Sequence, residues 1–128
     1  MSKEHPRIIY VGDDVRGQAL RIAVQSRGWR VYLPTERLQA LGMYAVYFPD
    51  IVVLEAVSGS NLAEEVCFHL RTVRVEPLLI LTDELQHEQW NVSAMSAIHV
   101  LPRTASIDDL IAAILELIES SKELVTCE

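Results

Sequence analysis

The 128-residue sequence is poor in several features, and each shortage excludes a class of protein. Five glycines and five prolines are too few for a fibrous or disordered chain. Eleven lysines and arginines against 18 aspartates and glutamates give a net charge of −7, which excludes unspecific, charge-driven binding to nucleic acid. No apolar run approaches the roughly 20 residues of a membrane span, and the N-terminus lacks the apolar segment of a signal peptide. The two cysteines, Cys67 and Cys127, suit a reduced cytoplasmic protein better than a disulfide-linked secreted one.

Half of the residues are apolar and the mean hydropathy is +0.19, which is enough to bury a full core. We therefore expect a single domain over residues 1–128, with its core at about 7–120, in the cytoplasm. No Ser-His-Asp spacing and no second pair of carboxylates indicates catalysis, so we do not expect an enzyme.

Short runs of branched apolar residues predict five β-strands. Three are strong, at 7–11 (RIIYV), 50–54 (DIVVL) and 78–82 (LLILT), and two are weaker, at 30–33 and 98–101. Their apolar residues are consecutive rather than alternating, as in parallel strands that are covered on both faces. Segments with helical spacing separate them, which predicts an α/β fold with a doubly wound parallel sheet.

The ends of the intervening helices can also be predicted. The first helix should span about 15–26, with Leu20, Ile22, Ala23 and Val24 facing inward, and should end at Gly28. The second should open at Pro34 and close near Gly42, the third should begin at Asn61, and the fourth should span 84–97. The last begins at Ser106 and carries two apolar rows, which fit either one wide core-facing surface or a core stripe beside a self-association surface. The first row consists of Ile107, Ile111, Ile114 and Ile118, and the second of Leu110, Leu117 and Leu124.

Polar residues follow the carboxyl ends of the predicted strands, where open parallel sheets bind their ligands. Asp13 and Asp14 follow the first strand, Glu55 the third, Thr82 the fourth and Arg103 the fifth. The three acids could together hold a hard divalent cation such as Mg²⁺.

Three segments at these strand ends resemble a response-regulator receiver domain (CheY-like) of two-component signalling. PDIVVLE (49–55) resembles the segment that leads to the phosphoaccepting aspartate, and LLILTD (78–83) resembles the strand that ends in the switch hydroxyl. HVLPRTASIDDLIAAI (99–114) resembles the strand, lysine and final helix of that family. The resemblance implies a flavodoxin-like (βα)5 sheet with strand order 2-1-3-4-5.

The sequence departs from this pattern at the residues that carry the family's chemistry. Glu55 stands at the phosphoacceptor position, Arg103 replaces the lysine and Thr104 the proline after it, while Val100 lies where the family has an aromatic switch residue. Gly12 falls at or beside the first position of the acidic pair, so either Gly12 and Asp13 or Asp13 and Asp14 could fill the pair. Only Thr82 matches the family. We hypothesise a fixed Glu55–Arg103 ion pair; the alternative is that both are solvated and do not meet.

These departures predict an atypical receiver, a pseudo-receiver that binds protein partners independently of phosphorylation. The resemblance places its interaction surface on the helix 84–97, the strand 98–101 and the final helix, for a protein partner or a second copy, with no role for nucleic acid or membrane. One alternative is a receiver that still binds Mg²⁺ and accepts a phosphoryl group from a histidine kinase. The other is a small-ligand or nucleotide-binding domain that uses the loop 58–61 (SGSN).

Overall fold

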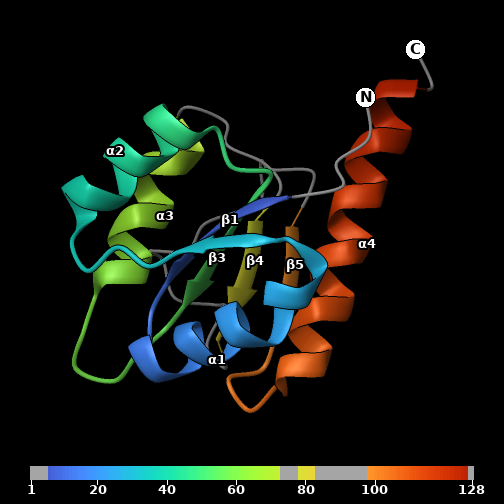
Figure 1. Ribbon diagram of the computed structural model, residues 1–128. Coiled ribbons are helices and arrows are strands. Elements are labelled where there is room, and N and C mark those ends of the chain that lie inside the picture. Colours follow the sequence, from blue (N-terminus) through green and yellow to red (C-terminus); the bar gives the residue numbers. More distant parts are fainter. Residues whose placement is uncertain (1–5, 73–77, 83–97, 127–128) are drawn as a thin grey trace.

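The computed structural model describes residues 6–72, 78–82 and 98–126, which form a five-stranded sheet between two layers of helices (Figure 1). All neighbouring strands are parallel and their order is β2-β1-β3-β4-β5, so the predicted fold and strand order are confirmed. The strands are β1 (Arg7–Val11), β2 (Arg30–Tyr32), β3 (Ile51–Glu55), β4 (Leu78–Leu81) and β5 (Ile98–Leu101).

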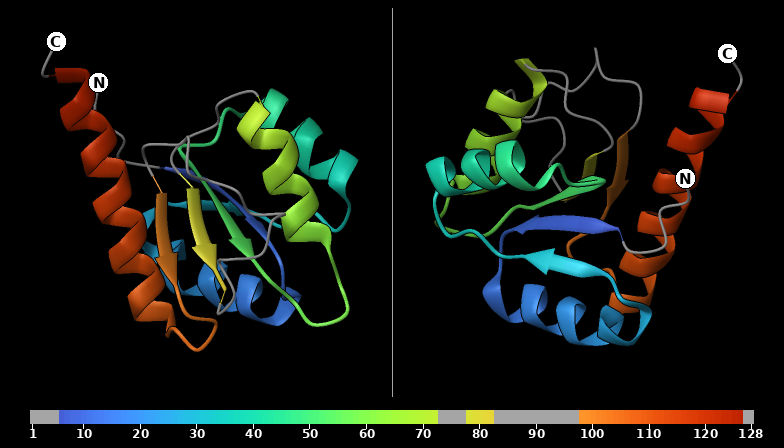
Figure 2. Two further views of the ribbon diagram at one scale, coloured as in Figure 1. Left: turned by 180° about the vertical axis from the view of Figure 1, so that it is seen from behind. Right: turned by 45° about the horizontal axis from the view of Figure 1, so that its top comes forward.

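Helices cover both faces of the sheet, as the views in Figure 2 show. They are α1 (Asp14–Val24), which continues into the short 3₁₀ helix η1 (Gln25–Arg27), α2 (Arg37–Tyr47), α3 (Leu62–Thr72) and α4 (Ile107–Thr126). No helix in the described ranges is long and apolar enough to cross a membrane. The helix predicted at 84–97 lies outside the described residues.

The strands supply alternate side chains to two separate cores, because successive strand residues point to opposite faces. Ile8, Tyr10 and Val53 belong to the core under α1 and α4, whereas Ile9 and Val52 belong to the core under α2 and α3. Glu55 follows Val53 by two positions on β3, so its carboxylate points toward the α1 and α4 side.

The two apolar rows of α4 form one wide core-facing surface over the part of the helix whose side chains are described. Leu110 and Leu117 are as well buried as Ile114 and Ile118. The interpretation of the leucine row as a self-association surface is therefore wrong for Leu110 and Leu117, because the sheet covers them. The side chain of Leu124 lies outside the described residues.

Two predictions about the first helices are wrong. Ile22 is 69% exposed because it lies about half a turn away from Leu20 and Val24, which face the core, and Ala23 is also exposed. The second helix does not stop at Gly42. It continues to Tyr47 and ends at Phe48, which takes a left-handed conformation (φ 49°) directly before Pro49.

Other helix ends agree with the predicted chemistry. Gly28 ends η1 in the left-handed conformation (φ 78°), which a glycine adopts without steric cost. At the start of α4, the Asp109 amide donates to Ser106 Oγ (3.1 Å) and the Ser106 amide donates to Asp109 Oδ2 (3.2 Å). This reciprocal cap fixes where α4 leaves the loop after β5.

Candidate functional site

The polar residues predicted at the strand ends gather at the carboxyl edge of the sheet. Glu55 is the last residue of β3 and pairs in register with Leu81, so Thr82 lies one position beyond it on the neighbouring strand. Thr82 is buried, and its amide donates to the Leu101 carbonyl at 3.0 Å, which holds the ends of β4 and β5 together. Arg103 lies two residues after β5, at the same edge.

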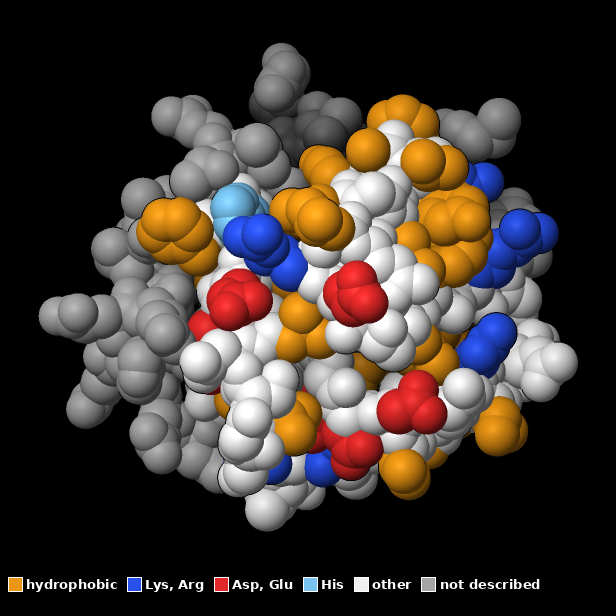
Figure 3. Space-filling view, turned by 90° about the vertical axis from the view of Figure 1, so that its left-hand side faces the viewer, with side chains coloured by type: hydrophobic (Ala, Val, Ile, Leu, Met, Phe, Trp, Pro, Cys, Tyr) orange, Lys and Arg blue, Asp and Glu red, His pale blue; other side chains and the backbone are white. Residues whose placement is uncertain are grey.

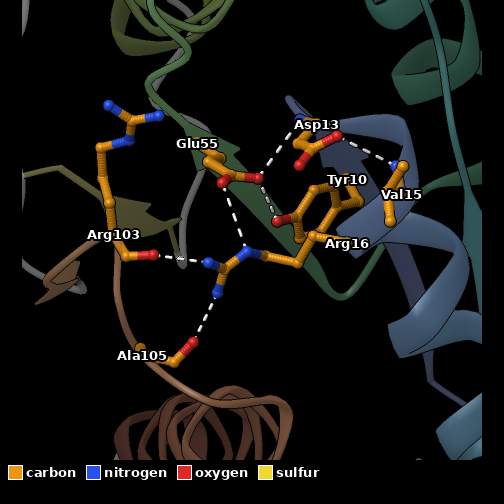
Figure 4. Close-up of polar contacts among 7 residues, drawn as sticks. All are labelled: Tyr10, Asp13, Val15, Arg16, Glu55, Arg103 and Ala105. Atoms are coloured by element: carbon orange, nitrogen blue, oxygen red, sulfur yellow. Dashed lines mark hydrogen bonds and ion pairs between the residues drawn. The ribbon is translucent and has the colours of Figure 1, made fainter.

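Glu55 is the centre of this site, and its carboxylate is enclosed (Figure 4). The residue is only 3% exposed. The Tyr10 hydroxyl and the Asp13 amide donate to Oε1, the latter at 3.2 Å, and Arg16 Nε lies 3.3 Å from Oε2. Each carboxylate oxygen therefore has a donor, and the negative charge is balanced by one guanidinium.

Arg16 connects Glu55 to the loop between β5 and α4. Its Nη1 donates to the Ala105 carbonyl and its Nη2 to the Arg103 carbonyl, both at 2.5 Å. One planar side chain on the first turn of α1 thus joins α1, β3 and the loop 102–106.

The hypothesis of a Glu55–Arg103 ion pair is wrong in its cation. The partner of Glu55 is Arg16, and Arg103 contributes its backbone carbonyl to the Arg16 guanidinium (Figure 4). Strand-end reasoning missed Arg16 because this residue lies within α1. The signal available in the sequence was an arginine one turn after an acidic strand end, which is weak by itself.

Tyr10 reaches Glu55 from β1, beneath α1. Burial raises the pKa of its hydroxyl far above the usual value near 10, and the adjacent Glu55 carboxylate raises it further, so Tyr10 stays protonated and donates. Gly17 on α1 leaves the space for this ring, since an added Cβ would lie 2.6 Å from Leu33 Cδ2 and 3.2 Å from Tyr10 Cδ1.

Gly12 lies directly against Glu55. Val11 pairs in register with Leu54, so the next positions on the two strands, Gly12 and Glu55, are opposite each other. A Cβ on Gly12 would lie 2.5 Å from Glu55 Cβ and 3.1 Å from its Oε1, and Gly12 has a φ of 154°. An acidic side chain at position 12 could not enter without displacing Glu55.

The loop 58–61, which the sequence suggests as an anion-binding loop, forms a tight turn that uses the Ser60 amide internally. The Ser60 amide donates to the Val57 carbonyl at 3.0 Å, and the Leu62 amide donates to Ser60 Oγ at 3.2 Å. Gly59 forms the turn with a φ of 80°. This arrangement is a tight turn that leads into a helix cap.

Comparisons with known proteins agree with the fold and with the resemblance found in the sequence. The chain is 32% identical over 121 residues to the response regulator MprA of Mycobacterium leprae (strain TN), covering 91% of this chain and 52% of that protein. It therefore spans about half the length of the curated relatives that it matches. No family model matches the sequence.

Solved structures of receiver domains superpose on nearly the whole chain. The receiver domain of the Francisella response regulator 1452 gives a TM-score of 0.70 at 19% identity, covering 91% of this chain and 99% of that one. This chain therefore has the fold of a receiver domain, and its sequence is similar to that of a response regulator. A structure described as belonging to a family of streptococcal redox sensors that evolved from two-component response regulators gives a TM-score of 0.76 at 21% identity. It covers 96% of this chain and 55% of that one.

The acidic edge of the sheet does not fit the Mg²⁺ ion that the resemblance implies. Asp13 Oδ1 accepts from the Val15 amide at 3.0 Å as the N-cap of α1, and Asp14 is exposed on the first turn of that helix. Glu55 is already paired with Arg16. Within the described ranges, no three Asp, Glu, His or Cys side chains converge as a metal site, so the set Asp13, Asp14 and Glu55 is not assembled.

Proposed function

We propose that this chain is a receiver domain that acts in two-component-type signalling as a phosphorylation-independent binding module for proteins, without catalytic activity of its own. The observation that carries the proposal is the enclosure of Glu55 by Tyr10, the Asp13 amide and Arg16. The similarity to response regulators supports the signalling context.

An accepting carboxylate must present an oxygen to the phosphoryl donor, and the enclosed Glu55 does not meet this requirement. In-line attack loses much of its rate when the nucleophile is displaced by about 1 Å, and an oxygen buried under donors is not in line with an external phosphate. Glu55 is also one methylene longer than aspartate. Its carboxylate is therefore better described as an internal structural anion than as a nucleophile.

Arg16 supplies permanently the positive charge that a divalent cation would otherwise bring. A guanidinium remains protonated at every physiological pH, and its planar fork can serve a carboxylate and carbonyls at once. Since it also holds the carbonyls of Arg103 and Ala105, the loop before α4 is tied to β3 without any ligand. We infer that this tie keeps the domain in one conformation.

The partner surface that we propose comprises β5, the exposed side of α4 and the segment 84–97, which lies outside the described residues. His99 Nδ1 and Glu116 Oε1 lie 3.4 Å apart across β5 and α4. Both side chains are accessible at that surface, and a partner could bind them directly.

The test is the response of the ¹⁵N-labelled chain to Mg²⁺, then to beryllofluoride, with acetyl phosphate and intact-mass measurement as the covalent counterpart. We expect the amides of Gly12, Asp13, Glu55 and Thr82 to be unmoved and no mass increase. Ligand-dependent shifts at these amides that spread into α4, or a stable phosphoryl adduct, would show a working phosphorylation switch and overturn the proposal.

A matched variant makes a negative result informative. Glu55→Asp combined with Arg16→Ala restores the family's shorter carboxylate and removes the internal cation, so that acidic groups at this edge are no longer neutralised from within. We expect Mg²⁺-dependent amide shifts in this variant only. If Mg²⁺ causes no amide shifts in this variant either, Arg16 is not the residue that prevents Mg²⁺ from binding.

A further inference from the structure

A second polar site lies on the opposite side of the sheet, between α2 and α3. A cavity of about 370 Å³ is lined by Arg37, Glu64, Glu65, Phe68 and His69. Figure 3 faces this side and shows basic, acidic and histidine side chains together, with hydrophobic side chains around them. We call it the α2–α3 cavity. None of these residues takes part in the Glu55 site, so a ligand here is independent of the proposed function.

The charges of the α2–α3 cavity leave an excess of one negative charge. Arg37 Nη1 lies 2.8 Å from His69 Nε2. Because a guanidinium can only donate, His69 Nε2 is the acceptor in this contact. One guanidinium and two carboxylates, those of Glu64 and Glu65, then sum to −1, and among described residues neither carboxylate has an ion-pair partner.

One carboxylate oxygen of Glu64 lacks a hydrogen-bond donor among the described residues. Its Oε1 is buried and receives no hydrogen bond from any residue that the structure describes. A buried carboxylate oxygen without a donor is costly, and charged donors are the strongest that can satisfy it. Arg37 lines the same cavity, but its guanidinium contacts His69 and makes no hydrogen bond to Glu64 Oε1.

The surroundings of the cavity favour a polypeptide ligand over a free cation. Phe68, which lines the cavity, is 49% exposed, and Leu38, next to Arg37 on α2, is 70% exposed. The exposed residues of α2 carry no charge and are mostly apolar: Leu38, Gln39, Gly42, Ala45 and Val46. A planar cation could lie on the Phe68 ring, while apolar neighbours on the same ligand would cover Leu38.

We propose that the α2–α3 cavity binds an arginine side chain of a partner polypeptide. The guanidinium donates to Glu64 Oε1, neutralises the excess charge and stacks on Phe68, while an adjacent apolar residue of the partner packs on Leu38. Arginine fits better than lysine because its planar fork can stack and donate at once.

The test titrates the ¹⁵N-labelled full chain with an acetylated, amidated alanine-based helical peptide that carries leucine and arginine four residues apart. The control peptide has citrulline in place of arginine, which keeps the shape and removes the charge. We expect the arginine peptide to shift the amides of Arg37, Leu38 and residues 64–69, and to bind at least tenfold more tightly than the citrulline peptide. Equal binding of the two peptides, or no binding of either, would overturn the proposal.

Two variants and one small molecule complete the design. Glu64→Gln should abolish the preference for arginine, whereas Glu119→Gln, which removes the same charge from the exposed side of α4, should keep it. If Glu64→Gln does not fold, the comparison of the two peptides decides. Agmatine, a free guanidinium compound, should bind at least tenfold more weakly than the peptide; equal affinity would contradict a polypeptide ligand.

Discussion

Replacing Arg16 with methionine should destabilise the folded chain strongly. Methionine retains most of the apolar stem, so the change removes mainly the charge and its hydrogen bonds. It leaves Glu55 buried with its negative charge unbalanced, and it leaves the carbonyls of Arg103 and Ala105 without their donor.

The size of this effect can be worked from the geometry. Removing one partner of a buried ion pair costs about 3–5 kcal/mol. The Arg16 side chain is 22% exposed, so solvent screens part of the interaction, and we expect a loss of about 3 kcal/mol at the lower end of that range. Urea unfolding monitored by circular dichroism measures it. With a slope of about 2 kcal/mol per M, the midpoint should fall by about 1.5 M.

A double-mutant cycle separates the charge from the rest of the side chain. Glu55→Gln combined with Arg16→Met removes both charges, so the double variant should recover at least about 1 kcal/mol relative to Arg16→Met alone. Arg21→Met is the matched control. Arg21 is exposed on the same helix, and its one hydrogen bond to a described residue is a 3.4 Å contact with Gln18 Oε1, so its loss should stay within about 0.5 kcal/mol. An Arg16→Met midpoint equal to that of Arg21→Met, or a double variant less stable than Arg16→Met, would refute the reasoning.

Two further predictions concern Gly12 and Tyr10. Gly12→Ala should lower the free energy of unfolding by about 2 kcal/mol or more, because its Cβ would lie 2.5 Å from Glu55 Cβ at a φ of 154°. Gly42→Ala, whose Cβ meets no atom within 4 Å, should instead stabilise the protein by about 0.5–1 kcal/mol. Thermal unfolding of the two variants measures both effects, and equal effects would contradict the packing argument. Because the pKa of Tyr10 is raised in the folded state, its contribution to stability is complete below pH 10 and is lost above it, by about 1.4 kcal/mol per pH unit. Tyr10→Phe should remove this part of the alkaline decline in urea-unfolding free energy, and a variant that declines as steeply as the parent would contradict the assignment.

The fold could be predicted from the sequence because its main signals are local. Consecutive apolar residues mark strands that are covered on both faces, as in β3, and the caps at Gly28 and Ser106 mark helix ends. The errors arose where a local signal was ambiguous. Gly42 suggested a helix end, but a glycine within a helix costs only about 1 kcal/mol, and the helix continues to Tyr47.

The sequence by itself determined which residues lie at the carboxyl edge of the sheet, since strand ends fix the positions of Glu55, Thr82 and Arg103. Only the tertiary structure decided how Glu55 is used. The cation that pairs with Glu55 lies on α1, and the register of β1 against β3 places Gly12 opposite Glu55. The local sequence specifies neither relation, because the first depends on how a helix packs over a sheet and the second on which residues of two strands lie opposite each other.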